Sequence, residues 1–455
     1  MSKVIKLCEK LSTINFYSPQ QEYDLYRESF LRSELGGIYQ CIPWDELIRG
    51  FRLKLSKVGR KALFDSQGQL ALMFLKSYTD LSDRKLIEQL NANIDYQLFC
   101  GVLLSPGERL VDYKITSKIR TQLGKKLDIK SCQNILAKYW KPMLTDTHAM
   151  LTDATCYESQ LRYPTNVKLL WESVNWNYNQ LKLLCKGLRV RMPRNKHLEQ
   201  REKYYQYQRK RRKPQMDTTK RIRSLLYLLD KLNGLLDQFE QQYHNRLELP
   251  DKYYQKRKVI RKVYHQQKQM FETGKSIPDR IVSISKSYIR PIVRGKEIKK
   301  VEFGAKVNMI QVDGINFIEH LSFDAFHEGN RLISSIWLSQ YLFGKTTHIS
   351  ADAIYATNKN RRYCTKNQIT TNFARKGRAG KHEQQRKLIS KALNKERASR
   401  MEGSFGTEKE HYSLHKVKAK NQANEMLWIF FGVHTANTVR IVKKMQSKEL
   451  NQKVA

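Results

Sequence analysis

The chain changes character at Ala149-Met150-Leu151-Thr152-Asp153-Ala154-Thr155-Cys156. Apolar and β-branched residues dominate this stretch, which is typical of a strand, whereas the residues before it follow a helical pattern. A sheet is therefore predicted to begin here, with Asp153 inside its first strand. Asp146 lies seven residues earlier and competes as the functional aspartate. We favour Asp153, because the apolar run leads directly into it.

Two further acidic residues stand in distinctive surroundings. Asp352 closes the strand-like run Thr347-His348-Ile349-Ser350-Ala351-Asp352. Glu402 falls in Arg400-Met401-Glu402-Gly403-Ser404-Phe405-Gly406-Thr407-Glu408-Lys409, near the end of a helix predicted to start close to Glu383. Lys409 lies seven residues after Glu402, two helical turns along the same face. The three acids form a candidate triad.

Carboxylates of this kind are what phosphoryl transfer on DNA requires. Two Mg²⁺ ions about 4 Å apart can activate the attacking oxygen and neutralise the leaving one. Mg²⁺ prefers oxygen ligands and keeps some of its waters, so three protein carboxylates suffice. Asp153, Asp352 and Glu402 fit this requirement, as candidate catalytic and metal-binding residues. We expect two Mg²⁺ ions, with Mn²⁺ able to substitute.

The charge balance indicates a polyanionic partner. The 455 residues include 84 Lys and Arg against 43 Asp and Glu, giving a formal net charge of +41, which favours nucleic acid. Hydrophobic residues make up 40%, which excludes a disordered chain. No apolar run predicts a membrane span or signal peptide, and the scattered cysteines predict reduced thiols rather than a zinc site. We expect a soluble, intracellular protein that binds DNA and no membrane.

The N-terminal part is predicted to be helical. Leu70, Phe74 and Leu75 form one apolar face, and Ser82 can cap the next helix. Short helices joined by polar turns can form a helix-turn-helix DNA reader. Its phosphate contacts would be Arg84, Lys85, Lys118 and Arg120. A helical bundle used for packing or dimerisation is the equally weighted alternative.

A basic helical insertion is predicted between residues 191 and 280. Apolar residues alternate spacings of three and four at Ile222, Leu225, Leu229, Leu232, Leu236, Phe239 and Tyr243. The pattern resumes after Pro250, which predicts an antiparallel hairpin. The cluster Arg209-Lys210-Arg211-Arg212-Lys213 makes it a candidate DNA clamp, with a solvated charged surface as the alternative.

Strand patterns then return at Ile281–Ile284, Val307–Ile310 and Asn316–Ile318, and a helix is predicted from Asn330 to Phe343. The predicted class is α/β. The domains are residues 1–140 (helical, DNA-binding or dimerising), 141–190 with 281–445 (catalytic), 191–280 (insertion) and 446–455 (tail).

Four groups of residues carry a family resemblance: Leu151-Thr152-Asp153-Ala154-Thr155 with Arg162-Tyr163-Pro164-Thr165, Arg290-Pro291-Ile292-Val293-Arg294-Gly295-Lys296 with Glu302-Phe303-Gly304-Ala305-Lys306, Ala351-Asp352-Ala353-Ile354-Tyr355, and Arg400-Met401-Glu402-Gly403-Ser404-Phe405-Gly406. Together they resemble DDE transposases of bacterial insertion sequences, in the insertion-sequence-four and -five branch, over about residues 64–442. The resemblance implies a ribonuclease-H-like mixed-sheet core that carries Asp153, Asp352 and Glu402. It also implies binding of terminal inverted repeats, metal-dependent cleavage and strand transfer, by a cytoplasmic, nucleoid-associated prokaryotic protein. Because two ends must be processed together, and because the heptad pattern can pair two chains, we expect a homodimer in the active complex.

The branch has a tyrosine-arginine-glutamate-lysine signature that this chain keeps only in part. Lys409 follows Glu402 at the expected distance, but Ala398 stands at the arginine position and Lys395 at the tyrosine position. Arg397 and Arg400 are the candidate replacements for the arginine.

The basic segments and the resemblance together give the predicted DNA contacts. They are Lys409, Arg400, Arg290, Arg294, Lys296, Lys306, Arg375, Lys376, Arg378, Arg209, Arg211 and Arg212.

Other chemistries fit less well. Gly344-Lys345-Thr346 imitates the end of an ATP-binding loop, but Ser339 stands where its first glycine is needed, so no use of ATP is expected. Two alternatives to a transposase remain: an inactive, domesticated DNA-binding protein, and a metal-dependent structure-specific nuclease with the same core.

Overall fold

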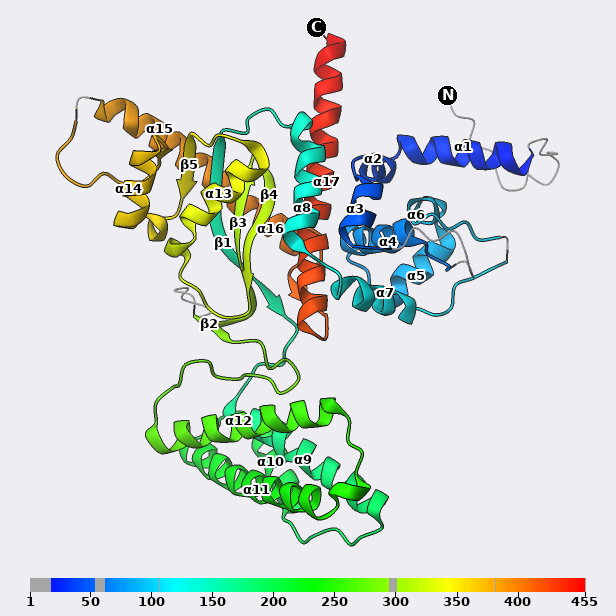
Figure 1. Cartoon of the computed structure of the whole chain (residues 1–455), viewed down its shortest axis with the longest axis vertical. Coiled ribbons are helices and arrows are strands. Elements are labelled where there is room, and N and C mark those ends of the chain that lie inside the picture. Colours follow the sequence, from blue (N-terminus) through cyan, green and yellow to red (C-terminus); the bar gives the residue numbers. More distant parts are fainter. Residues whose placement is uncertain (1–17, 54–61, 106, 294–300, 381, 455) are drawn as a thin grey trace.

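A mixed sheet lies at the centre of the chain (Figure 1). The structure is a computed structural model, and it describes residues 18–53, 62–105, 107–293, 301–380 and 382–454. The described residues form seven strands: β1 (Ala149–Ser159), β2 (Pro291–Val293), β3 (Val301–Val312), β4 (Ile315–Ser322), β5 (His348–Ala351), β6 (Thr370–Thr371) and β7 (Lys416–Val417). Their order is β2-β3-β1-β5-β6, with β4 against β3 and β7 against β1. The class is therefore mixed α/β.

Strand β1 organises the sheet. It pairs antiparallel with β3, from Met150 opposite Val312 to Glu158 opposite Gly304, and parallel with β5, where Thr152 lies opposite Ala351. Successive side chains of a strand point to opposite faces. Met150 accordingly belongs to one buried cluster, whereas Leu151 and Tyr157 belong to another. Asp153 is on the Leu151 face.

Helices cover both faces. On the Met150 face lie α8 (Ile129–Trp140) and α13 (Leu332–Phe343). The opposite face receives Met401 and Phe405 from one long helix. This helix consists of α15 (Glu383–Glu396), a π-helical segment, η6 (Arg397–Glu402), and α16 (Gly403–His411). The short helix α14 (Asn358–Lys366) precedes β6.

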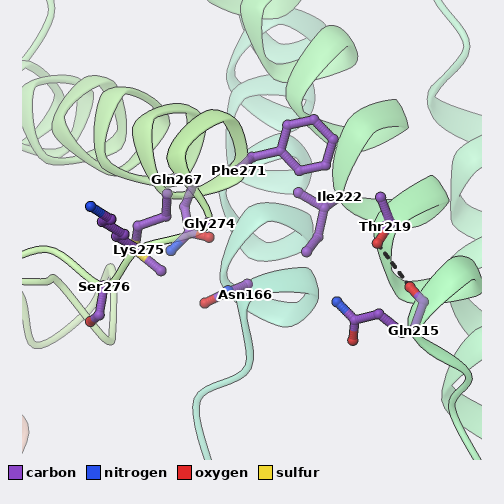
Figure 2. Close-up of a pocket in the computed structure, with 10 residues that line it drawn as sticks. Asn166, Gln215, Thr219, Ile222, Gln267, Phe271, Gly274, Lys275 and Ser276 are labelled. Carbon is purple, nitrogen blue, oxygen red and sulfur yellow. Dashed lines mark hydrogen bonds between the residues drawn. The ribbon is translucent and has the colours of Figure 1, made fainter.

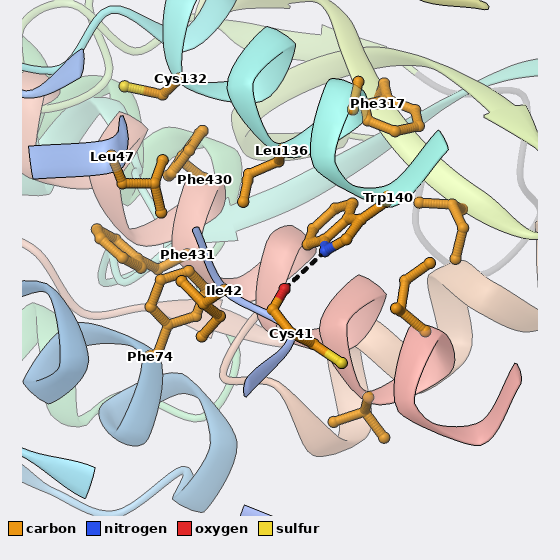
Figure 3. Close-up of a cluster of buried hydrophobic side chains, with 14 of the residues drawn as sticks. Cys41, Ile42, Leu47, Phe74, Cys132, Leu136, Trp140, Phe317, Phe430 and Phe431 are labelled. Atoms are coloured by element: carbon orange, nitrogen blue, oxygen red, sulfur yellow. Dashed lines mark hydrogen bonds between the residues drawn. The ribbon is translucent and has the colours of Figure 1, made fainter. Parts of the chain in front are cut away.

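The N-terminal helices share a core with the sheet. The helices before α8 are α1 (Pro19–Arg32), α2 (Glu34–Gln40), α3 (Trp44–Gly50), α4 (Ser66–Thr79), α5 (Asp83–Ala92), α6 (Ile94–Phe99) and α7 (Lys114–Gly124). Figure 3 shows Phe74 of α4 beside Phe431 of α17 (Gln422–Val454), with Trp140 donating to Cys41 O over 2.8 Å. One cluster thus joins these helices, α17 and the sheet. The cap predicted at Ser82 is confirmed, since its Oγ accepts from Lys85 N.

A separate helical unit follows β1 and lies below the sheet in Figure 1. It contains α9 (Asn166–Leu188), α10 (His197–Arg209), α11 (Gln215–Gln242) and α12 (Asp251–Thr273), which have their own core. The heptad prediction is confirmed, because Leu225, Leu229, Leu232, Leu236 and Phe239 are buried on α11.

The helical unit is larger than the sequence predicted. It begins at Asn166 rather than at residue 191, because the apolar side of α9 packs against α11. The predicted strand at Ile281–Ile284 is wrong, since those residues form no strand. Their isoleucines instead pack into the core of the helical unit. A buried network anchors the return to the sheet: Glu425 accepts from Ser159 Oγ over 2.5 Å and pairs with Lys286.

Two expectations about the chain as a whole can be checked. The cysteines within the described residues, Cys41, Cys100, Cys132, Cys156, Cys185 and Cys364, are free and buried. In the same part of the chain, no helix has the length and apolarity needed to cross a membrane.

Candidate active site

Asp153 lies within β1, on the face covered by the π-helical segment η6. Its Oδ1 accepts from Ala154 N over 2.8 Å, and its Oδ2 accepts from Arg397 Nη1 over 2.9 Å. Burial raises the pKa of Asp153 to about 6, although Ala154 N–H and Arg397 both favour the carboxylate. The charges of Glu328 and Asp352 raise this pKa further. The carboxyl therefore sits in a partly dehydrated, acidic environment.

Asp352 follows directly after β5. The parallel register of Thr152 and Ala351 puts Asp352, just past the end of β5, beside Asp153 on β1. Its exposed carboxylate caps a short 3₁₀ helix, η5 (Ala353–Tyr355), by accepting from Ala353 N over 2.7 Å. The competing Asp146 lies before β1, where its Oδ1 accepts from His148 N over 2.8 Å. Of the two candidates for the first aspartate, Asp153 is the one on the strand next to β5.

Glu402 approaches Asp153 from η6, the helical segment that covers this face of the sheet. It is the last residue of η6, its side chain is 54% exposed, and its Oε1 lies 3.1 Å from Arg397 Nη1. The buried Met401 next to it fixes the helix on the sheet. One nitrogen of Arg397 therefore contacts both Asp153 and Glu402. The two carboxylates are close enough to share a single cation.

This arrangement fits a divalent cation by its chemistry. Carboxylate oxygens are the ligands that Mg²⁺ and Mn²⁺ prefer. Asp153 and Glu402 share a positively charged partner, and Asp352 adds negative charge from the adjacent strand. Within the described ranges, however, no group of three or more His, Cys, Asp or Glu side chains is arranged to hold a metal. The arginine occupies the space between two of the carboxylates.

The π-helical segment bears on Arg397 and Arg400, the two candidate replacements for an arginine at position 398. A π-helix bonds residue i to residue i+5, so residues five apart lie about one turn apart. Arg397 is five residues before Glu402, and the segment Arg397–Glu402 is π-helical. Arg397 thus reaches the face that an arginine at position 398 would reach in a regular α-helix. The other candidate, Arg400, instead pairs with Glu396 over 2.8 Å.

A fourth carboxylate, which the sequence did not reveal, lies near Asp153. Glu328 begins a short 3₁₀ helix, η4 (Glu328–Asn330), and raises the pKa of Asp153 through its charge. It pairs with Lys306 over 2.8 Å, and Lys306 Nζ also donates to Phe326 O over 2.9 Å. No local pattern marks Glu328, because only the folding of the chain brings η4 beside β1.

The predicted DNA contacts lie in different surroundings. Some have intramolecular partners: Arg290 donates to Ser287 O over 2.6 Å, Arg375 pairs with Glu383 over 3.3 Å, and Lys376 donates to Asn358 over 2.8 Å. Arg378 is exposed in the loop before α15, and Lys409 Nζ lies 5.9 Å from the centre of the Tyr157 ring. Arg209, the last residue of α10, is exposed, as are Arg211 and Arg212 in the segment before α11. Arg294 and Lys296 lie outside the described residues.

One expected phosphate contact in the N-terminal region is corrected. Arg120 is buried, and its guanidinium makes two bonds to Asp83, of 2.6 and 3.2 Å. The same group lies 4.7 Å from the centre of the Trp428 ring. Arg120 therefore holds α5, α7 and α17 together. Arg84 pairs with Glu88 over 2.8 Å and Lys118 with Asp112 over 3.0 Å, and both lysine and arginine remain exposed.

The helical unit contains a cavity of about 290 Å³ between α9, α11 and α12 (Figure 2). Its lining is mostly polar and uncharged, with Asn166, Gln215 and Gln267 beside the apolar Ile222 and Phe271. No carboxylate lines it. The cavity therefore differs from the candidate active site, which is formed by carboxylates.

Comparison with known families supports one class of protein. Residues 26–122 match the family model described as Transposase domain (DUF772). The match runs from within α1 to within α7, so it covers the N-terminal helices and not the three carboxylates. No curated protein and no solved structure matches the chain. The family match supports a transposase, an enzyme that cuts and joins DNA.

Proposed function

We propose that the protein is a DDE transposase that cleaves DNA at the ends of its own mobile element and joins them to target DNA. The observation that carries this proposal is the meeting of Asp153 and Glu402 at one Arg397 nitrogen, with Asp352 on the adjacent strand. The transposase match to the N-terminal helices supports the same class independently, because it involves none of these residues.

We further propose a ribonuclease-H-like core. Its support is the mixed sheet, in which β1 lies between the antiparallel β3 and the parallel β5. The first aspartate stands on β1, the second follows β5, and the glutamate comes from a helix across one face. This is the placement that the resemblance to DDE transposases implies.

In the proposed reaction, Asp153, Asp352 and Glu402 would hold two Mg²⁺ ions. When bound, these ions would neutralise charge on the attacking and leaving oxygens of an in-line displacement. Water attacks the phosphodiester at the end of the element, and the bond to the 3′-oxygen breaks to release a 3′-hydroxyl. That hydroxyl then attacks a phosphodiester of target DNA. The bond from this phosphorus to the target's own 3′-oxygen breaks, which leaves a 3′-hydroxyl on the target strand, and no covalent bond to the protein forms.

Basic side chains near the acids would position the DNA. Lys409 and Arg400 lie on the helix that carries Glu402, and Arg378 lies in the loop before that helix. We assign them to phosphates flanking the scissile bond, where lysine and arginine fix position without reading sequence. Since two ends must be processed together, we propose a homodimer as the active form.

An Asp153→Asn variant tests the function, with Asp146→Asn as the matched control. The substrate is linear DNA containing the coding region and its natural flanks, with Mg²⁺ or with EDTA. Loss of an outer-shell partner alone costs metal sites about 10- to 100-fold, so Asp153→Asn should lose at least about 100-fold in Mg²⁺-dependent cleavage. Asp146→Asn should retain activity, because its carboxylate lies outside the site.

Equal cleavage by wild type and Asp153→Asn would contradict the assignment. Pre-cut ends separate a transposase from a nuclease: joined products in target DNA support the transposase, whereas hydrolysis alone contradicts strand transfer. A chain that binds these ends and cleaves nothing with either Mg²⁺ or Mn²⁺ would instead be a DNA-binding protein only.

A further inference from the structure

A second basic feature lies away from the carboxylates, between the N-terminal helices and the beginning of α17. It is a groove of about 1060 Å³. One wall comes from α5 and α7, and the other from the residues that join β7 to α17. We call it the basic groove. Its cations are Arg84, Lys114, Lys118, Lys125, Lys126, Lys418 and Lys420.

The positive charge of the basic groove is largely uncompensated. Its one acidic lining residue is Asp83, which is already paired with the buried Arg120. Lys114, Lys125, Lys418 and Lys420 are exposed, and none of them has an ion-pair partner among the residues that the structure describes. Four unpaired ammonium groups on two facing walls favour an anionic ligand that is long enough to contact both.

The N-terminal ends of helices add to the positive charge of the basic groove. The basic groove is lined by the start of α5 at Ser82, the start of α7 at Lys114, and Asn421, which directly precedes α17. Ser82 Oγ accepts from Lys85 N, Asp112 Oδ1 from Lys114 N and Asn421 Oδ1 from Asn424 N, so one N–H group at each helix start is paired. The aligned peptide dipoles still give each helix start a partial positive charge. The helix ends therefore act in the same direction as the lysines.

The two walls are fixed relative to each other. Asn424 Nδ2 donates to Thr121 Oγ1 over 3.1 Å, which links α17 to α7. A Cβ added at Gly124 would lie 2.7 Å from Asn424 Oδ1, so the helices approach closely here. Beneath them, Trp428 contacts the guanidinium of Arg120. The lysines are thus carried on a rigid frame, which lowers the entropic cost of binding.

We propose that the basic groove binds the sugar-phosphate backbone of duplex DNA, through Lys114, Lys125, Lys418 and Lys420. This inference rests on the proposed function and adds a DNA surface on the N-terminal side of the molecule, outside the acidic site. Its lysines contact phosphates and contribute affinity without sequence preference. The pairing of an N-terminal wall with a C-terminal one means that neither segment forms the surface alone.

The test replaces these four lysines together by glutamine in the full-length chain. The control replaces Lys138, Lys141, Lys443 and Lys448 by glutamine. These lysines are also exposed, and their replacement lowers the net charge by the same amount. Two of these lie far along α17 from the basic groove, since a helix rises about 1.5 Å per residue. Binding of a random duplex of about 30 base pairs is measured by fluorescence anisotropy in EDTA over a range of salt concentrations.

Each phosphate contact contributes about 0.9 to the slope of log K against log salt. The slope for the groove variant should become shallower by about 3 to 4, whereas the control should keep the wild-type slope. Equal slopes for both variants, or an unchanged slope for the groove variant, would overturn the inference. Because the assay excludes metal, that result leaves Asp153-dependent cleavage untouched. Failure of the unaltered chain to bind any duplex would overturn the proposed function as well.

Discussion

Arg120 and Arg397 both contact carboxylates, and they do so in opposite ways. Arg120 forms a two-bond pair with Asp83 and is covered by Trp428, so its charge is matched and enclosed. Arg397 contacts both Asp153 and Glu402, with Asp352 on the neighbouring strand. The first arrangement is balanced, whereas the second has more negative than positive charge.

This difference separates a structural ion pair from a candidate active site. A matched buried pair joins elements of the fold, and losing either partner leaves the other charge dehydrated. Of the three carboxylates at the second site only Asp153 is largely buried, and extra negative charge beside a buried carboxyl is typical of functional sites. The exposed Glu402 keeps the Arg397 site open on one side.

The largest expected effect comes from breaking the balanced pair. Asp83→Ala leaves Arg120 buried without a partner and should lower the free energy of unfolding by about 3–5 kcal/mol. Urea unfolding followed by tryptophan fluorescence measures this change. Glu88→Ala on the same helix removes an exposed partner of Arg84 and should cost about 0–1 kcal/mol. Equal losses would show that Arg120–Asp83 is no stronger than a surface pair.

A smaller effect comes from Lys76, which lies beside the balanced pair. Burial lowers the pKa of Lys76 to about 8, opposed by Asp83 and assisted by Arg120. Between pH 8 and 10.5 the unfolded chain binds more protons at Lys76, so this residue makes the wild type more stable as pH rises. Lys76→Met should therefore be about 1–3 kcal/mol more stable than wild type at pH 7, and lose that advantage near pH 10.5. A difference that does not change with pH would contradict this.

The smallest effect tests the unbalanced site. If Arg397 and a divalent ion compete for the same carboxylate oxygens, Arg397→Gln should bind Mn²⁺ about tenfold more tightly, because a charge-assisted hydrogen bond no longer opposes the metal. Electron paramagnetic resonance of free Mn²⁺ measures the affinity. Arg400→Gln is the control, since Arg400 pairs with Glu396 and not with the candidate ligands. Weaker binding by Arg397→Gln would mean that the arginine supports the site instead of competing for it.

Much of the local structure could be predicted from the sequence. The apolar run around Asp153 is a strand, Asp352 follows another, and the heptad leucines of α11 are buried. These predictions depend on periodicity, which a segment carries whatever its neighbours are. The predictions failed where the packing of a distant segment decided whether a residue is in a strand or is buried. Ile281 and Ile284 look strand-like but pack onto the helical unit, and Arg120 looks exposed but meets Asp83.

The sequence by itself determined the types of residue present: three carboxylates in strand or helix settings, and a large excess of lysine and arginine. Only the tertiary structure decided which of them meet. Asp153 and Arg397 are 244 residues apart in the chain, and the π-helical segment brings Arg397 onto the face of Glu402. Sequence patterns show which side of a helix or strand is apolar, but they do not show which other segment packs against that side. Contacts between distant segments depend on how sheet and helices pack, so the shared arginine and the basic groove appear only in the folded chain.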